Sequence, residues 1–146
     1  MNTKRATKDD LQVLIPLFDG YRVFYNQTSN PEAAGTFLAE RFEKEDSVIL
    51  IAVDEEGNGL GFTQLYPSFS SVSMQRTYIL NDLFVTPDAR GKGIGEALME
   101  HAKQFANTQN AKGLTLETNT DNPARFLYER LGWEKDTEVF HYTWKA

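Results

Sequence analysis

The chain has 146 residues, of which 40% are hydrophobic and 25% charged, which suits one domain with a single core. The absence of cysteine excludes disulfides, zinc–cysteine sites and a thiol nucleophile, and the net charge of −6 argues against nucleic-acid binding. No apolar run is long enough to span a membrane, and the N-terminus lacks the apolar core of a signal peptide, so we expect a cytoplasmic protein.

Apolar residues recur at helical spacing in four stretches, which are 11–25, 31–44, 94–105 and 124–130. Pro16 and Gly20 interrupt the first stretch, so we expect that helix to be kinked or split. Asn30 and Asn122 each precede a proline and carry a side chain that caps helices. We therefore expect them at the N-caps of the second and fourth helices.

Strand-like composition occurs in six stretches, which are 3–6, 47–53, 60–66, 75–85, 114–118 and 139–145. Pro67 closes the third of these, and we expect the serine-rich residues 68–73 to form an exposed loop. The last stretch puts Phe140, Tyr142 and Trp144 on one face, which packs either in the core or at a dimer interface. The helical crossover between strands 75–85 and 114–118 requires that these strands run parallel, so the sheet is mixed.

A glycine-rich loop joins the strand that ends at Val85 to the helix that begins at Ile94. Its glycines clear side chains away from the first N–H groups of the helix, and its two cations add positive charge. This combination favours a phosphate or pyrophosphate site, although a tight turn with solvated basic residues would also need glycines. The loop residues are Arg90, Gly91, Lys92, Gly93, Ile94 and Gly95.

Glu96 stands where a Rossmann fingerprint needs a third glycine, and no P-loop Gly-Lys-Ser/Thr is present. The loop instead resembles the Arg/Gln-x-x-Gly-x-Gly/Ala motif of the GNAT N-acetyltransferase superfamily, which holds the pyrophosphate of coenzyme A. The segment from Asn122 to Trp133 resembles the same superfamily's Asn…Ala…Leu-Tyr-x-x-x-Gly-Phe/Trp element. Two other classes stay open: a coenzyme A sensor without chemistry, and a phosphate-binding domain unrelated to acyl transfer.

The resemblance implies an α/β (α+β) domain over residues 1–146. Its sheet would be mixed and mostly antiparallel, with a central splayed pair of parallel strands and about four flanking helices. Acetyl-CoA would be the co-substrate, lying against the backbone of Leu83, Phe84 and Val85, with its pyrophosphate on the loop from Arg90 to Gly95. No metal is implied, since the two histidines, His101 and His141, are isolated.

Tyr128 corresponds to the tyrosine that acts as general acid toward the thioester sulfur in the family; its other use would be as a core aromatic. Asn122 corresponds to an asparagine that contacts the cofactor in the family. Family members usually have one more residue between this asparagine and the tyrosine, and at that spacing from Tyr128 this chain has Asp121. Glu117 matches the glutamate that serves as general base in some members. For each carboxylate the alternative is a solvated charge at a strand end.

The acceptor is expected to be a primary amine: a polyamine, a small amine or a lysine side chain. The acidic composition favours such a cation, and Asp82 would bind it. Asn81 stands where spermidine/spermine N-acetyltransferases have glutamate, so it cannot be a base. Tyr21 and Tyr25 form one wall of the acceptor pocket or pack on the core. These segments resemble the branch that acetylates polyamines and histones, in which homodimers are common.

Overall fold

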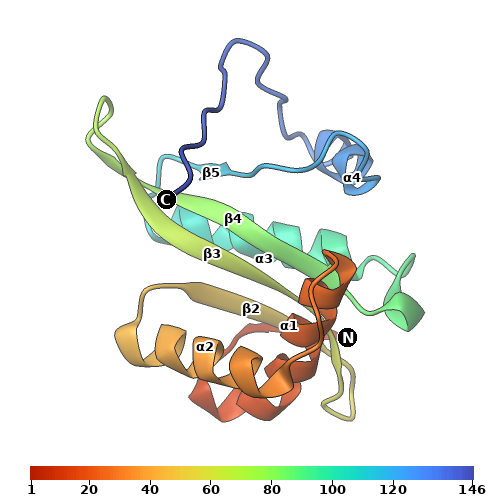
Figure 1. Cartoon of the computed structure of the whole chain (residues 1–146). Helices are drawn as coiled ribbons and strands as arrows, with labels where there is room; N and C mark the ends of the chain where they lie inside the picture. The colour runs from red at the N-terminus through yellow and green to blue at the C-terminus, as the bar shows by residue number, and fades with distance from the viewer.

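A computed structural model describes all residues, 1–146, and arranges five strands in one sheet with helices on both faces (Figure 1). The first four strands pair antiparallel in chain order, and the fifth lies parallel to the fourth. This confirms an α+β fold with a mixed sheet and a parallel pair. The strands are β1 Asn2–Arg5, β2 Val48–Val53, β3 Gly59–Ser70, β4 Gln75–Val85 and β5 Leu114–Thr115.

Two apolar clusters pack on the two faces of the sheet. Helices α1 (Leu11–Phe24) and α2 (Pro31–Lys44) cover one face, where their apolar residues meet Phe62 and Phe84. Helix α3 (Ile94–Thr108) covers the other face, and α4 (Ala124–Arg130) packs its apolar residues against the same cluster. The sheet is therefore buried on both sides, which explains the continuous apolar run of β2.

Helix α1 is one continuous helix, so of the two expected outcomes, a kink or a split, the split is excluded. Pro16 lies inside it, and the helix continues across Gly20 to Phe24. Gly20 has a packing reason to be glycine, because a Cβ there would lie 3.0 Å from Cζ of Phe84. The glycine thus lets α1 approach the end of β4 closely.

Strand β3 continues through Pro67 to Ser70, so the expected loop over 68–73 shrinks to a turn. Strand β2 begins at Val48, opposite Leu65, so beyond Leu65 strand β3 has a strand partner on one side only. Proline is tolerated at such an edge because its missing N–H breaks no ladder bond there. The β3–β4 hairpin consequently projects beyond the rest of the sheet (Figure 1).

Strand β4 contains a bulge at Asn81. Gln64 pairs with Asp82, but the next residue of β3, Leu65, pairs with Leu80, which leaves Asn81 without an opposite residue. Leu80 therefore faces the α3 cluster, whereas Phe84 faces the α1–α2 cluster. The bulge turns Asp82 toward α1, a direction that regular alternation along β4 does not predict.

Strand β5 is shorter than the expected 114–118, because β4 and β5 diverge. Leu114 pairs with Tyr78 and Thr115 with Ile79, and no pairing follows. Residues 116–118 and the second half of β4 therefore face each other without a ladder between them.

The expected strand 139–145 does not form. These residues have no regular structure, and Phe140, Tyr142 and Trp144 are 87%, 91% and 86% exposed. The expectation that they pack in the core was wrong, because no strand edge of the chain pairs with them. Figure 1 shows this C-terminal segment as a loop that leaves α4 and returns toward β5. No helix of the protein combines the length and apolar character needed to cross a membrane.

Candidate active site

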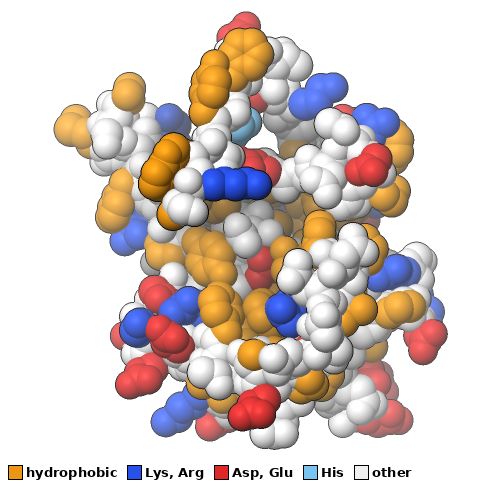
Figure 2. All heavy atoms as spheres, viewed as in Figure 1, with side chains coloured by type: hydrophobic (Ala, Val, Ile, Leu, Met, Phe, Trp, Pro, Cys, Tyr) orange, Lys and Arg blue, Asp and Glu red, His pale blue; other side chains and the backbone are white.

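A cavity of about 270 Å³ opens where β4 and β5 diverge. Helix α4 and the end of α1 complete its walls, and Figure 2 shows the surface hollowed between the part containing α1 and α2 and the part containing α4. Ten of its 17 lining residues are hydrophobic, as is usual for a small-molecule site. The lining residues, polar and apolar together, include Phe24, Tyr25, Leu80, Asn81, Leu83, Phe84, Val85, Arg90, Gly95, Leu116, Glu117, Thr118, Asn122 and Tyr128.

Strand β4 supplies one wall of the cavity through Leu83, Phe84 and Val85. Past Ile79 the edge of β4 that faces β5 has no strand partner. Backbone N–H and C=O groups on an unpaired edge need other hydrogen-bond partners. An extended ligand with amide groups can take the place of the missing strand here.

The glycine-rich loop meets the cavity at Arg90 and Gly95. Gly91 and Gly93 have φ values of +74° and +79°, and a Cβ at either would meet no atom within 4 Å. Backbone conformation therefore requires these glycines, and the loop is open on that side. Gly93 is the N-cap of α3, so the free N–H groups of the first helical turn begin at this point.

The side chain of Arg90 is turned back onto the protein. Its Nε donates to the carbonyl oxygen of Val85 at 3.0 Å, and its guanidinium lies 5.6 Å and 5.8 Å from the ring centres of Phe24 and Phe84. Arg90 thus stabilises the end of β4 and joins it to α1. Of the two loop cations, Lys92 does not line the cavity.

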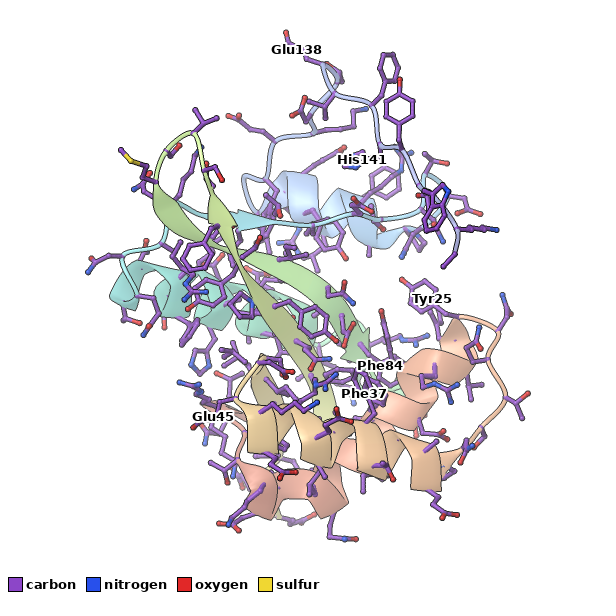
Figure 3. All side chains as sticks on the ribbon, turned by 60° about the vertical axis from the view of Figure 1, so that its left-hand side comes forward. Tyr25, Phe37, Glu45, Phe84, Glu138 and His141 are labelled. Atoms are coloured by element: carbon purple, nitrogen blue, oxygen red, sulfur yellow. The ribbon has the colours of Figure 1, made fainter.

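Tyr128 lies on the α4 side of the cavity, with its ring centre 6.3 Å from that of Trp133. Burial, together with the nearby Tyr25, raises the pKa of Tyr128 to about 12. The phenol therefore stays protonated at neutral pH and can donate a hydrogen bond into the cavity. Figure 3 shows Tyr25 at the end of α1, above Phe84 and pointing toward the same space.

Asn122 lines the cavity, but it is not the N-cap of α4. Pro123 occupies that position, and Asn122 Oδ1 accepts from the backbone N–H of Ala124 at 3.0 Å. The asparagine still satisfies a free N–H at the start of the helix, in the manner of an Asx turn.

The predicted acceptor residues separate into two groups. Asn81 and Tyr25 line the cavity, whereas Asp82 and Tyr21 lie behind it. Tyr21 packs edge-on against Phe62, with ring centres 5.8 Å apart, and its hydroxyl lies 3.4 Å from the carbonyl oxygen of Asn81. The tyrosine pair is therefore divided: Tyr21 packs on the core, and Tyr25 lines the cavity.

Asp82 is 2% exposed and has no cationic partner. Burial raises its pKa above the ordinary value, against the opposing effect of hydrogen bonds from Asn81, Gln64 and Tyr21. Asn81 Nδ2 donates to Oδ1 at 2.7 Å, and Gln64 Nε2 donates to Oδ2 at 2.5 Å. The idea of Asp82 as a solvated strand-end charge was therefore wrong.

Glu117 lines the cavity and is largely exposed. Its Oε1 lies 3.0 Å from Nδ1 of His141, which brings the C-terminal segment to the rim of the cavity (Figure 3). The other histidine, His101, contacts Thr3 Oγ1 at 3.1 Å on the far side of the chain from this pair. No group of three or more acidic or histidine side chains is arranged to hold a metal ion.

Sequence reasoning missed Leu116 and Thr118, which also line the cavity. The alternation of 114–118 was a signal for both, since it places Leu116 and Thr118 on the same side. Gln64 was missed altogether. An isolated glutamine in an apolar strand gives no local sign of its cross-strand partner.

Comparison with known proteins identifies the class to which this fold and cavity belong. The model of the acetyltransferase (GNAT) family matches residues 14–133. The uncharacterized N-acetyltransferase YhfO of Bacillus subtilis (strain 168) is 53% identical over 143 residues, covering 97% of this chain and 95% of that protein. A probable acetyltransferase of Haemophilus influenzae is 38% identical over 117 residues, covering 80% of each chain.

A solved structure described as a probable acetyltransferase has a TM-score of 0.94 at 42% identity, covering 100% of this chain and 98% of that one. The chain belongs to the acetyltransferase (GNAT) family. Members of this family use acetyl-CoA as co-substrate, so the protein is an acetyl-CoA-dependent N-acetyltransferase.

Proposed function

We propose that this domain transfers the acetyl group of acetyl-CoA directly to a cationic primary amine: a polyamine, a small amine or a lysine side chain. The observation that carries the proposal is the cavity between the diverging strands, with the Tyr128 phenol on one side and Asn81, backed by the buried Asp82, on the other. A hydrogen-bond donor for the leaving thiolate and a binding site for the cationic amine thus lie on opposite sides of the same cavity.

In this proposal acetyl-CoA takes the place of the missing strand between β4 and β5. Its amides pair with the backbone of Leu83, Phe84 and Val85, and a backbone N–H near Leu83 stabilises the oxyanion. Its pyrophosphate binds to the N–H groups of the loop from Gly91 to Gly95 and of the first turn of α3. Arg90 holds the end of β4 in position, with its guanidinium folded away from the loop N–H groups.

The amine must lose a proton before it attacks, and the thiolate must be stabilised as it leaves. Tyr128 donates to the departing sulfur. Glu117 is the candidate base, because its carboxylate lines the cavity and its Oε1 lies 3.0 Å from Nδ1 of His141. In this proposal both substrates lie side by side, so no covalent intermediate on the enzyme is needed.

Charge supports a cationic acceptor. Asp82 is a buried carboxylate without a positive partner, and the field of such a group favours an ammonium nearby. Arg22, the residue that a carboxylate-bearing acceptor would use, instead donates from Nη1 to the carbonyl oxygen of Thr28 at 3.1 Å. Free amino acids are therefore the less suitable acceptors.

The test is a panel of acceptors at fixed acetyl-CoA concentration: spermidine, small monoamines, a lysine-rich peptide and free amino acids. We expect acetyl-CoA to raise the melting temperature by mass action and thiol release to occur with at least one cationic amine. Turnover on free amino acids alone would contradict the cationic acceptor. A thermal shift without release on any amine would favour a coenzyme A sensor over an enzyme.

A further inference from the structure

Gln64 lies at the centre of β3 and is fully buried under α1 and α2. It stands directly opposite Asp82, so both side chains project from the same face of the sheet. Burying a glutamine beside a carboxylate is costly unless the pair is hydrogen-bonded. The 2.5 Å contact from Nε2 to Asp82 Oδ2 meets that requirement.

The hydrogen bonds run in order from the core to the cavity. Gln64 donates to one carboxylate oxygen of Asp82, and Asn81 donates to the other. One N–H of Asn81 Nδ2 is used by Asp82, which orients the amide, and the side-chain oxygen Oδ1 is the acceptor that Asn81, a residue lining the cavity, can offer. An ammonium or amine N–H is the complementary donor.

We propose that Gln64 is a positioning residue for the acceptor amine: it fixes the buried Asp82 carboxylate, which in turn orients the Asn81 amide in the cavity. This inference rests on the proposed function. It adds a residue that makes no contact with either substrate and that fixes the geometry of the acceptor side from within the core.

The unpartnered oxygen of Gln64 supports this role. Gln64 Oε1 is buried and has no hydrogen-bond partner, because the amide is turned so that its nitrogen faces Asp82. When Asp82 takes up a proton, half a turn about χ3 lets this oxygen accept from the carboxylic acid. An amide can therefore serve both charge states of Asp82, whereas an apolar side chain would serve neither.

Other groups around Asp82 do not replace Gln64. From α1, the hydroxyl of Tyr21 bonds to Asp82, and Tyr25 lies beyond it. From β3, Tyr66 is close enough for the Asp82 charge to raise its pKa, but the two side chains are not hydrogen-bonded. Arg41 and Asp46, near Tyr66, are 2.9 Å apart and largely cancel each other.

The experiment compares Gln64→Met with Thr63→Val in the full chain. Thr63 is a matched control, since it is equally buried in β3 and its Oγ1 bonds to the backbone oxygen of Asp82 at 2.7 Å. Asp82 is titrated by carboxyl-carbon NMR, and KM is measured for the amine and for acetyl-CoA. We expect Gln64→Met to raise the Asp82 midpoint by about one pH unit and the amine KM severalfold, with the acetyl-CoA KM unchanged.

Thr63→Val should leave both the midpoint and the amine KM near wild type. If Gln64→Met shifts the midpoint no further than Thr63→Val, or raises both KM values equally, Gln64 is merely structural and the inference fails. Should Gln64→Met not fold, Gln64→Glu places a second carboxyl beside Asp82. The coupled pair must then titrate in two steps, the upper of which lies above the midpoint of wild-type Asp82. The titration stands even if no amine is acetylated, so it separates failure of this inference from failure of the proposed function.

Discussion

At the residue scale, the proposed mechanism depends on Tyr128. Its hydroxyl is protonated at neutral pH, as any phenol is, and burial raises its pKa further, to about 12. Tyr128→Phe keeps the ring and its packing on Trp133 but removes the donor. We expect kcat to fall by roughly a hundredfold, with the acetyl-CoA dissociation constant within about twofold of wild type. Steady-state kinetics and calorimetry measure the two; an unchanged kcat would remove Tyr128 from the mechanism.

The buried charge of Asp82 lowers the stability of the fold, whereas the proposed function needs that charge to bind the amine. Its pKa is raised in the folded state, so its stabilising effect is full below the unfolded pKa and is lost as the pH rises through the folded pKa. Asp82→Asn abolishes the charged form. We expect it to raise the melting temperature at pH 7 and to lower kcat/KM for the amine at least about tenfold.

Thermal unfolding across pH checks the sign of this effect. The stability difference between wild type and Asp82→Asn should shrink as the pH falls, because wild-type Asp82 then becomes neutral too. The opposite result would be an Asp82→Asn variant that melts below wild type at pH 7 but not at pH 4. That result would show that the ionised carboxylate stabilises the fold.

At the element scale, the loop between β4 and α3 depends on backbone conformation. Gly93→Ala places a Cβ at φ +79°, and Gly57→Ala does so at φ +87° in the β2–β3 turn, in each case with no neighbouring atom within 4 Å. Both should lower the free energy of unfolding by about 1 kcal/mol. Only Gly93→Ala should weaken acetyl-CoA binding, by about tenfold, since only Gly93 caps the helix at the proposed pyrophosphate site.

Urea unfolding and calorimetry of the two variants separate strain from binding. If Gly57→Ala weakens acetyl-CoA binding as much as Gly93→Ala, the loss reflects general destabilisation, and the loop has no special role. Equal unfolding energies with unequal affinities would support the loop as the pyrophosphate site.

At the scale of the whole molecule, the C-terminal segment leaves three aromatic side chains uncovered. Phe140, Tyr142 and Trp144 are almost fully exposed, and β5 has a partner on one edge only. Soluble proteins seldom leave large apolar patches and open strand edges uncovered. We predict that a second copy covers them. Sedimentation should show a dimer for wild type and a monomer for Phe140→Ser/Tyr142→Ser/Trp144→Ser, whereas a monomeric wild type would contradict this.

The sequence by itself determined the helices, the family and the loop at the start of α3, because local signals carry them: apolar spacing at the period of a helix, a proline after an asparagine, and glycines where φ must be positive. It also identified Tyr128, Asn122 and the end of β4, all of which line one cavity. It did not determine how long β3 or β5 would be, because strand length depends on where a partner strand ends.

Only the tertiary structure decided how Asn81 and Asp82, the acceptor-side residues of the proposed function, are oriented. A regular strand alternates between faces, but the bulge at Asn81 inserts one residue and turns Asp82 from the α3 face to the α1 face. That turn places Asp82 against Gln64, a residue 18 positions away in the chain. The strand register decides this pairing, and register is a property of two strands together, which neither strand's sequence expresses alone.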